Sequence, residues 1–203
     1  MSERFNNKGI YNHEKLVIFD NEAVTKQLLY EIRSEQVGGQ HFANNIRVLA
    51  ALMGQNWLYM HSPFVTSPPI IIGIPRGGTP MAEGVKKVSP ESPLVFTDAR
   101  GKQNPNRKLL PENSPKETRD IIICDTVVGT GNTIANTIQE LKRSFPATNI
   151  SLFSTVASEF SVGRLSDEFP NLEIYTACVE AKYEWVNRDG RQVFRTVSEM
   201  LEI

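Results

Sequence analysis

The sequence predicts an α/β domain with a mostly parallel sheet flanked by helices. Short, almost wholly apolar runs recur along the chain, as at residues 70–74 and 121–124, and stretches with helical spacing of apolar residues separate them. Strands that are apolar at every position are buried on both faces, which is typical of parallel sheets covered by helices. The 203 residues suffice for one domain with a sizeable core.

The N-terminal part, up to about residue 60, is expected to be helical. Apolar residues recur at helical spacing from residue 21 to about residue 60, and Gly38-Gly39 interrupt the pattern, so two helices are predicted there. Proline residues then mark a loop that leads into the apolar run at 70–74, which predicts a buried strand. A short helix is expected at 81–87, and a second strand at 94–97.

The rest of the chain continues this alternation after a long polar stretch at residues 98–120. Loops of that length are usually functional or disordered. After it we expect a strand at 121–124, a helix at 133–144, a strand at 150–156, a helix at 162–169 and a last core strand at 172–179. The predicted core therefore covers about residues 61–179, and residues 180–203 form a small C-terminal segment.

The composition excludes several classes of partner. The chain has 22 Lys and Arg against 23 Asp and Glu, so it lacks the basic excess of a duplex-binding domain, and no nucleic-acid partner is expected. Every apolar run is far shorter than the roughly 20 residues of a membrane helix, and the first nine residues form no apolar signal core. The cysteines Cys124 and Cys178 build neither a disulfide framework nor a zinc site. We expect a cytoplasmic protein with no membrane partner.

The segment at residues 121–141 carries the most specific chemistry. An apolar strand ends in Asp125, and a loop with two glycines and several hydroxyl or amide side chains leads into a helix. In open α/β sheets ligands bind beyond the carboxyl ends of strands, and glycines, hydroxyls and the first-turn amides of a helix favour a phosphate. Asp125 would accept hydrogen bonds from sugar hydroxyls beside it. The alternative is an ordinary capped turn. The loop residues are Gly129, Thr130, Gly131, Asn132 and Thr133.

Two better-known phosphate-binding loops do not fit this segment. A Walker loop requires Lys and then Ser or Thr after its last glycine, whereas Asn132-Thr133 follow Gly131. A dinucleotide-binding fingerprint requires a third Gly or Ala where Ile134 stands. Its acid also comes some twenty residues after the loop, whereas Asp125 precedes it.

A second anion-binding loop is predicted after the strand at 70–74. There the chain reads Pro75-Arg76-Gly77-Gly78. Glycines allow close backbone approach, and a guanidinium binds a diphosphate by paired hydrogen bonds. The alternative is that Arg76 is a solvated turn residue.

Together these features resemble the type I phosphoribosyltransferases, and most closely the uracil phosphoribosyltransferase family. Most type I members carry two adjacent acids before the phosphate loop, whereas Asp125 followed by Thr126 is similar to the single-acid variant of the uracil enzymes. Residues 28–52, 70–78 and 173–177 are also similar to segments of that family. The resemblance spans most of the chain and implies the type I fold, with a helical N-terminal arm and a C-terminal hood.

The resemblance implies a site for phosphoribosyl pyrophosphate (PRPP). Asp125 would hold the ribose and Arg76 the pyrophosphate, while a basic residue on a closing loop, Arg100 or else Lys102, would help to neutralise the leaving pyrophosphate. Basic residues in a loop are otherwise solvated surface. The implied cofactor is Mg²⁺, bound mainly through PRPP, and the implied assembly is a homodimer or higher homo-oligomer. The implied PRPP-binding set is Arg76, Gly77, Gly78, Arg100, Lys102, Asp125, Thr126, Gly129, Thr130, Gly131, Asn132 and Thr133.

The resemblance fails in the C-terminal segment, residues 180–203. The glycine-rich hood signature of the uracil enzymes is absent there, and Tyr183 and Trp185 are candidates to stack on a base, or else core aromatics. The resemblance implies a pentosyltransferase that moves the phosphoribosyl group of PRPP to a nitrogen of uracil or a related heterocycle, purines included, and releases pyrophosphate. The alternative is a non-catalytic regulator of the same fold that senses PRPP or a nucleotide.

Overall fold

The computed structural model describes residues 15–19, 23–33, 39–62, 67–97, 120–144, 149–180, 183–188 and 191–196. Its strands are β1 (Leu16–Ile18), β2 (Ile70–Gly73), β3 (Leu94–Phe96), β4 (Ile121–Cys124), β5 (Val127–Val128), β6 (Ile150–Ser158), β7 (Glu173–Glu180), β8 (Tyr183–Arg188) and β9 (Arg191–Thr196). Its helices are α1 (Ala23–Arg33), α2 (Gly39–His61), α3 (Gly78–Val88), α4 (Asn132–Ser144) and α5 (Glu159–Glu168).

A seven-stranded sheet forms the centre, in the order β1-β7-β6-β4-β2-β3, with the short β5 paired to β6. Each pairing in it is parallel. The register places Gly73, Cys124 and Phe153 side by side at the carboxyl ends of β2, β4 and the middle of β6. The predicted α/β fold with a parallel sheet is confirmed.

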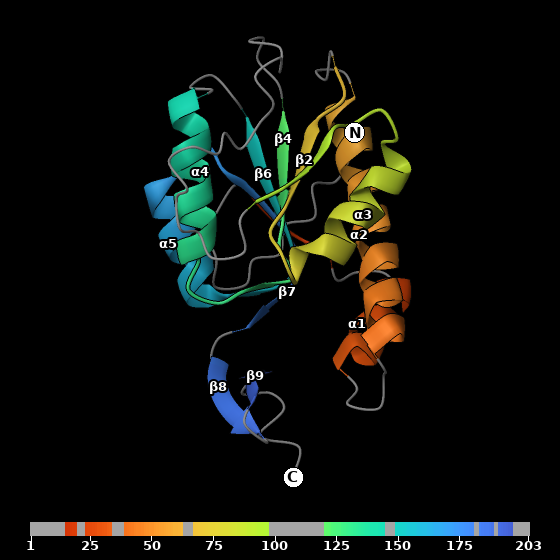
Figure 1. Ribbon diagram of the computed structural model, residues 1–203, viewed down its shortest axis with the longest axis vertical. Coiled ribbons are helices and arrows are strands. Elements are labelled where there is room, and N and C mark those ends of the chain that lie inside the picture. The colour runs from red at the N-terminus through yellow and green to blue at the C-terminus, as the bar shows by residue number, and fades with distance from the viewer. Residues whose placement is uncertain are drawn as a thin grey trace, which may run out of the picture.

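Helices cover both faces of this sheet (Figure 1). Alternate strand residues point to opposite faces, so Ile71 and Ile122 pack with α1, α2 and α3, whereas Ile72 and Ile123 pack with α4 and α5. The predicted N-terminal helices, separated near Gly38-Gly39, therefore form one of the two covering layers. Trp57 of α2 is among the largest fully buried side chains of that layer.

Several boundaries differ from the sequence prediction. The helix expected at 81–87 begins at Gly78, and the helix expected at 162–169 begins at Glu159, directly after the N-cap residue Ser158. Strands β1, β5, β8 and β9 were not predicted. Strands β1 and β5, with three and two residues, are too short to show a periodic pattern.

The C-terminal segment contains an antiparallel pair of strands, β8 and β9. In Figure 1 this pair lies below the end of β7, on the side of the sheet where the strands end. Among the described residues, no helix combines the length and the apolarity that crossing a bilayer requires.

Candidate functional site

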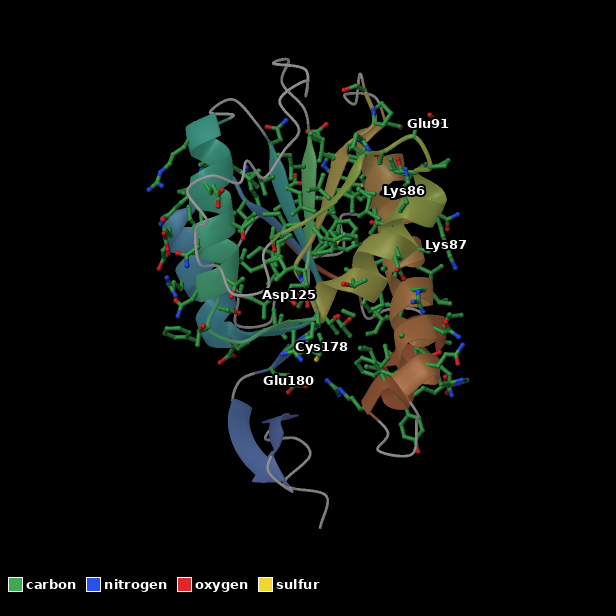
Figure 2. The ribbon with its side chains drawn as sticks, viewed as in Figure 1. Lys86, Lys87, Glu91, Asp125, Cys178 and Glu180 are labelled. Atoms are coloured by element: carbon green, nitrogen blue, oxygen red, sulfur yellow. The ribbon has the colours of Figure 1, made fainter. Side chains whose placement is uncertain are left out.

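The loops that follow β2 and β4 lie side by side, because these two strands are adjacent and end at the same level. The Ile74 amide donates to the Cys124 carbonyl at 2.9 Å, and the Thr126 hydroxyl donates to the Gly77 carbonyl. Figure 2 shows Asp125 at this edge of the sheet. The sequence-predicted Arg76 loop and Asp125 loop are thus brought together as one surface.

Gly78 sets how closely the two loops approach. A Cβ atom at Gly78 would lie 2.0 Å from the Cys124 carbonyl oxygen, so only glycine fits without a backbone shift. A Cβ atom at Gly77 would lie 3.4 Å from Asp125 Oδ1, which is ordinary contact and shows how near this backbone runs to the carboxylate. Gly77 and Gly78 therefore let the loop after β2 pack closely against the end of β4.

The carboxyl group of Asp125 lies at this edge of the sheet and has a shifted pKa. Burial raises the pKa of its carboxyl group from 3.8 to about 7, while hydrogen bonds from the Thr126 and Val127 backbone amides oppose the rise. The residue keeps intermediate solvent exposure. A carboxyl with this pKa is ready to ionise at neutral pH when hydroxyl donors of a ligand approach it. Asp125 is thus suited to hold sugar hydroxyls.

The loop from Gly129 to Thr133 has the backbone that a phosphate site needs. Gly131 has a positive φ of 73°, which side chains rarely adopt, and a Cβ atom there would also lie 3.2 Å from the Leu165 side chain. The Gly131 carbonyl accepts the Ala135 amide at 2.8 Å and so opens helix α4. The loop therefore leads from Asp125 into the N-terminus of a 13-residue helix, whose positive dipole end favours an anion.

Helix α5 and its N-cap residue Ser158 hold the loop at residues 129–133, the candidate phosphate loop, by hydrogen bonds that the sequence did not predict. The Ser158 hydroxyl donates to the Gly129 carbonyl and accepts the Ser161 amide at 3.0 Å as the N-cap of α5. The Ser161 hydroxyl donates to the Val128 carbonyl at 2.9 Å. Arg164 donates to the Thr130 carbonyl at 3.1 Å and to the Asn132 side chain. The N-cap pattern at Ser158 was the available signal for where α5 begins.

Arg76 stands exposed at the rim of the site, after a cis peptide bond from Pro75. Within the described part of the chain, no hydrogen bond or ion pair engages its guanidinium. Its donors are therefore available to an anionic ligand.

The other predicted site residues cannot be placed in this way. Arg100 and Lys102 lie outside the described residues. Tyr183 and Trp185 belong to β8, but their side chains lie outside what the structure describes. Over the described ranges, no group of three or more His, Cys, Asp or Glu side chains is arranged to hold a metal ion.

The sequence matches known proteins along most of its length. A family model described as uracil phosphoribosyltransferase matches residues 19–188. The chain is 26% identical to the uracil phosphoribosyltransferase of Sulfolobus acidocaldarius over 195 residues, which covers 81% of this chain and 89% of that protein. It is 25% identical to the uracil phosphoribosyltransferase of Bacillus cytotoxicus over 188 residues, covering 83% and 88%.

Solved structures share the fold at lower identity. The AQ2163 protein from Aquifex aeolicus superposes with a TM-score of 0.70 at 15% identity, covering 87% of this chain and 91% of that one. The adenine phosphoribosyltransferase of Trypanosoma brucei, solved with AMP, pyrophosphate and ribose-5-phosphate, gives a TM-score of 0.57 at 12% identity, covering 81% and 84%. These likenesses show a fold shared with a type I phosphoribosyltransferase.

Proposed function

Because the chain belongs to the uracil phosphoribosyltransferase family, we propose that it transfers the phosphoribosyl group of PRPP to a ring nitrogen of uracil or a related heterocycle and releases pyrophosphate. One observation carries the proposal: Asp125, at the carboxyl end of β4, is followed within a few residues by a candidate phosphate loop that hydrogen bonds from Ser158 and Arg164 hold in place. The Arg76 loop, bonded to the same strand end, supplies the third part of a PRPP site.

Each part of the site has one role in this reaction. The backbone amides of the Gly129–Thr133 loop and the start of α4 hold the 5′-phosphate, the Asp125 carboxylate holds the ribose hydroxyls, and Arg76 holds the pyrophosphate. A base nitrogen attacks C1′ with inversion while the bond to pyrophosphate breaks, and the proton of that nitrogen passes to the pyrophosphate or to water. Binding the remote groups positions C1′ for this in-line displacement, and such positioning lowers the barrier without a protein nucleophile.

The residues present fit Mg²⁺ held mainly by the substrate. Mg²⁺ is usually bound through one or two carboxylates together with substrate phosphates and water. Asp125 is a carboxylate at the ribose position, and the described residues offer no larger cluster of ligating side chains. When bound with PRPP, the ion would supply charge neutralisation to the pyrophosphate.

The choice of base remains a proposal, because the segment that follows β7 lacks the hood signature of the family. A homodimer or higher homo-oligomer, a single-domain organisation and a cytoplasmic location also remain predictions. Arg100 and Lys102 stay candidates for the closing loop over the pyrophosphate.

Pyrophosphate release tests the proposal directly. Purified protein with Mg²⁺ and PRPP is incubated with a panel of pyrimidines, purines and other heterocycles. We expect release that depends on one base and collapses in Asp125→Asn. PRPP binding without turnover on any base would instead favour a sensor of the same fold.

The Arg76 assignment has its own test, since a nucleoside monophosphate lacks the pyrophosphate. Arg76→Ala removes a charged hydrogen-bond donor of the kind worth about 1.5–3 kcal/mol, so we expect PRPP affinity to fall about 10- to 100-fold. Affinity for the nucleoside monophosphate product should stay unchanged. Equal losses for both ligands would contradict the pyrophosphate role.

A further inference from the structure

An open cavity lies at the edge of the sheet where β4, β6 and β7 begin, the upper edge in Figure 1. Its volume is about 570 Å³, and sites for small organic ligands measure roughly 300–1,000 Å³. Strand β6 crosses the sheet from Ser151 in this cavity to Ser158 beside the phosphate loop, an advance of about 23 Å at roughly 3.3 Å per residue. The cavity is therefore separate from the proposed PRPP site.

The walls of the cavity are apolar and its rim is charged. Ile138, Phe169 and Leu172 line it, and all three residues are buried. Lys15 and Lys142 line it as well but keep access to solvent. Apolar walls with a few well-placed polar groups are typical of sites that bind small molecules. The cavity thus has the composition of a ligand site.

The two lysine side chains reach the same part of the wall, the turn that joins α5 to β7. The Leu172 amide donates to the Phe169 carbonyl at 2.9 Å and closes this turn. Lys142 of α4 places its Nζ 5.1 Å from the centroid of the Phe169 ring. Lys15, which directly precedes β1, donates from its Nζ to Asn171 Oδ1 at 3.4 Å. Two ammonium groups from distant parts of the chain therefore converge on one turn.

The positive charge of these lysines has no carboxylate partner in the part of the chain that the structure describes. The two carboxylates that line the cavity are already engaged. Glu173 Oε2 lies 3.0 Å from His61 Nε2 and accepts the Ser151 hydroxyl at 3.2 Å. Asp120 Oδ1 accepts the Asn149 side-chain amide at 3.0 Å. Because an ammonium group donates and never accepts, the ligand that suits this wall carries acceptor oxygens.

We propose that this cavity binds a small organic anion, whose carboxylate or phosphate group is held by Lys15 and Lys142. The apolar body of the ligand packs against Ile138, Phe169 and Leu172. Carboxylate and phosphate offer the same kind of oxygen acceptor to an ammonium group, so the experiment has an arm for each. Lys142 also lies in the last turn of α4, where a cation stabilises the helix dipole, so its charge needs a matched control.

Calorimetric titration with a series of probes of similar shape tests the charge of the ligand. Benzoate, benzamide and benzamidine share one aromatic ring and carry an anionic, a neutral and a cationic group, and phenyl phosphate replaces the carboxylate by a phosphate. We expect the wild type to bind benzoate or phenyl phosphate at least about tenfold more tightly than benzamide, the gain from one charged hydrogen bond, and to bind benzamidine most weakly. The tighter of the two anions identifies the oxyanion that the site takes. Binding of neither anion at millimolar concentration, or equal binding of benzamide, would overturn the proposal.

Variants then locate the bound anion. Lys15→Gln and Lys142→Gln should each weaken the preferred anion about tenfold and leave benzamide within about twofold. Lys87→Gln is the matched control, because Lys87 stands in the last turn of α3 as Lys142 does in that of α4, and it should leave the affinity unchanged. Equal losses in the Lys87 and Lys142 variants would refute the lysine assignment. Arg76→Ala should also leave the affinity unchanged, and a loss there would place the anion at the carboxyl edge of the sheet instead.

Discussion

The Thr126 hydroxyl donates a hydrogen bond to the Gly77 carbonyl, and this bond joins the loop after β4 to the loop after β2. Thr126 is buried, and its own carbonyl accepts the Thr155 and Val156 amides at 3.0 and 3.1 Å. One residue thus anchors the Arg76 loop and the Asp125 loop to β6. The spacing between the proposed ribose and pyrophosphate positions is fixed by this connection.

Replacing Thr126 by Val should loosen that connection. Valine has nearly the same shape but cannot donate, so the Gly77 carbonyl loses its partner and stability should fall by about 1 kcal/mol. PRPP should bind more weakly, because the two loops no longer hold a fixed spacing. Chemical denaturation and PRPP titration measure the two effects. Thr126→Ser keeps the hydroxyl and should retain both properties; a Val variant as stable and as tight as the wild type would contradict the assignment.

Gly78→Ala should be strongly destabilising. The new methyl group would lie 2.0 Å from the Cys124 carbonyl oxygen, a rigid backbone atom, so either β4 or the start of α3 must move. Overpacking of this kind costs about 1–3 kcal/mol. In α5, Gly163 has nothing within 4 Å of an added Cβ atom, so Gly163→Ala should gain up to about 1 kcal/mol. Thermal unfolding of both variants checks the contrast, and similar midpoints would refute it.

Asp125 should make stability depend on pH. Its folded pKa of about 7 lies above the ordinary value of 3.8, so the folded protein binds a proton that the unfolded chain has released. Stability therefore falls as pH rises from about 4 to 7, by at most about 4 kcal/mol, and the loss is complete above pH 7. Asp125→Asn lacks this proton exchange, so its advantage over the wild type should grow across that window in denaturation curves. A difference that does not change with pH would show that the carboxyl pKa is not raised.

The layered fold could be predicted because its strands are short and apolar throughout. Runs such as 70–74 and 121–124 have no polar face to expose, so they require helices on both sides. Strands β1 and β5 escaped prediction because their place depends on hydrogen bonds to β7 and β6, not on a local pattern. The β8–β9 pair was not predicted either, although Asp189-Gly190 in the sequence favours a two-residue hairpin turn.

The parts of the candidate site that lie in continuous loops could be predicted from the sequence. The parts that depend on contacts between distant residues could not. Asp125, Arg76 and the glycines stand in two continuous loops, so Arg76 and the glycines indicated anion binding and Asp125 indicated an acceptor for sugar hydroxyls. The contribution of α5 required knowing that Ser158 lies beside the Gly129 carbonyl. The ion pair between Arg33 of α1 and Glu180 of β7 likewise joins residues far apart in the chain, and only the folded structure brings them into contact.

Ser158 offers the sharpest test of the α5 brace, because its hydroxyl performs two functions at once. It accepts the Ser161 amide at 3.0 Å as an N-cap and donates to the Gly129 carbonyl. Ser158→Ala loses both bonds and should cost about 1–2 kcal/mol in unfolding free energy. Because the Gly129 carbonyl then loses the hydrogen bond that helps to hold the loop, ribose 5-phosphate affinity should also fall.

Ser158→Thr keeps the hydroxyl and should retain both stability and affinity, which separates the hydrogen bonds from any effect of altering the end of β6. If Ser158→Ala lowered stability but left ribose 5-phosphate binding intact, the hydroxyl would serve only as the cap of α5, and the loop would hold its shape through its other contacts, such as the hydrogen bonds from Ser161 and Arg164. If affinity falls with stability, helix α5 is part of the binding site although none of its residues stood among the predicted ligands.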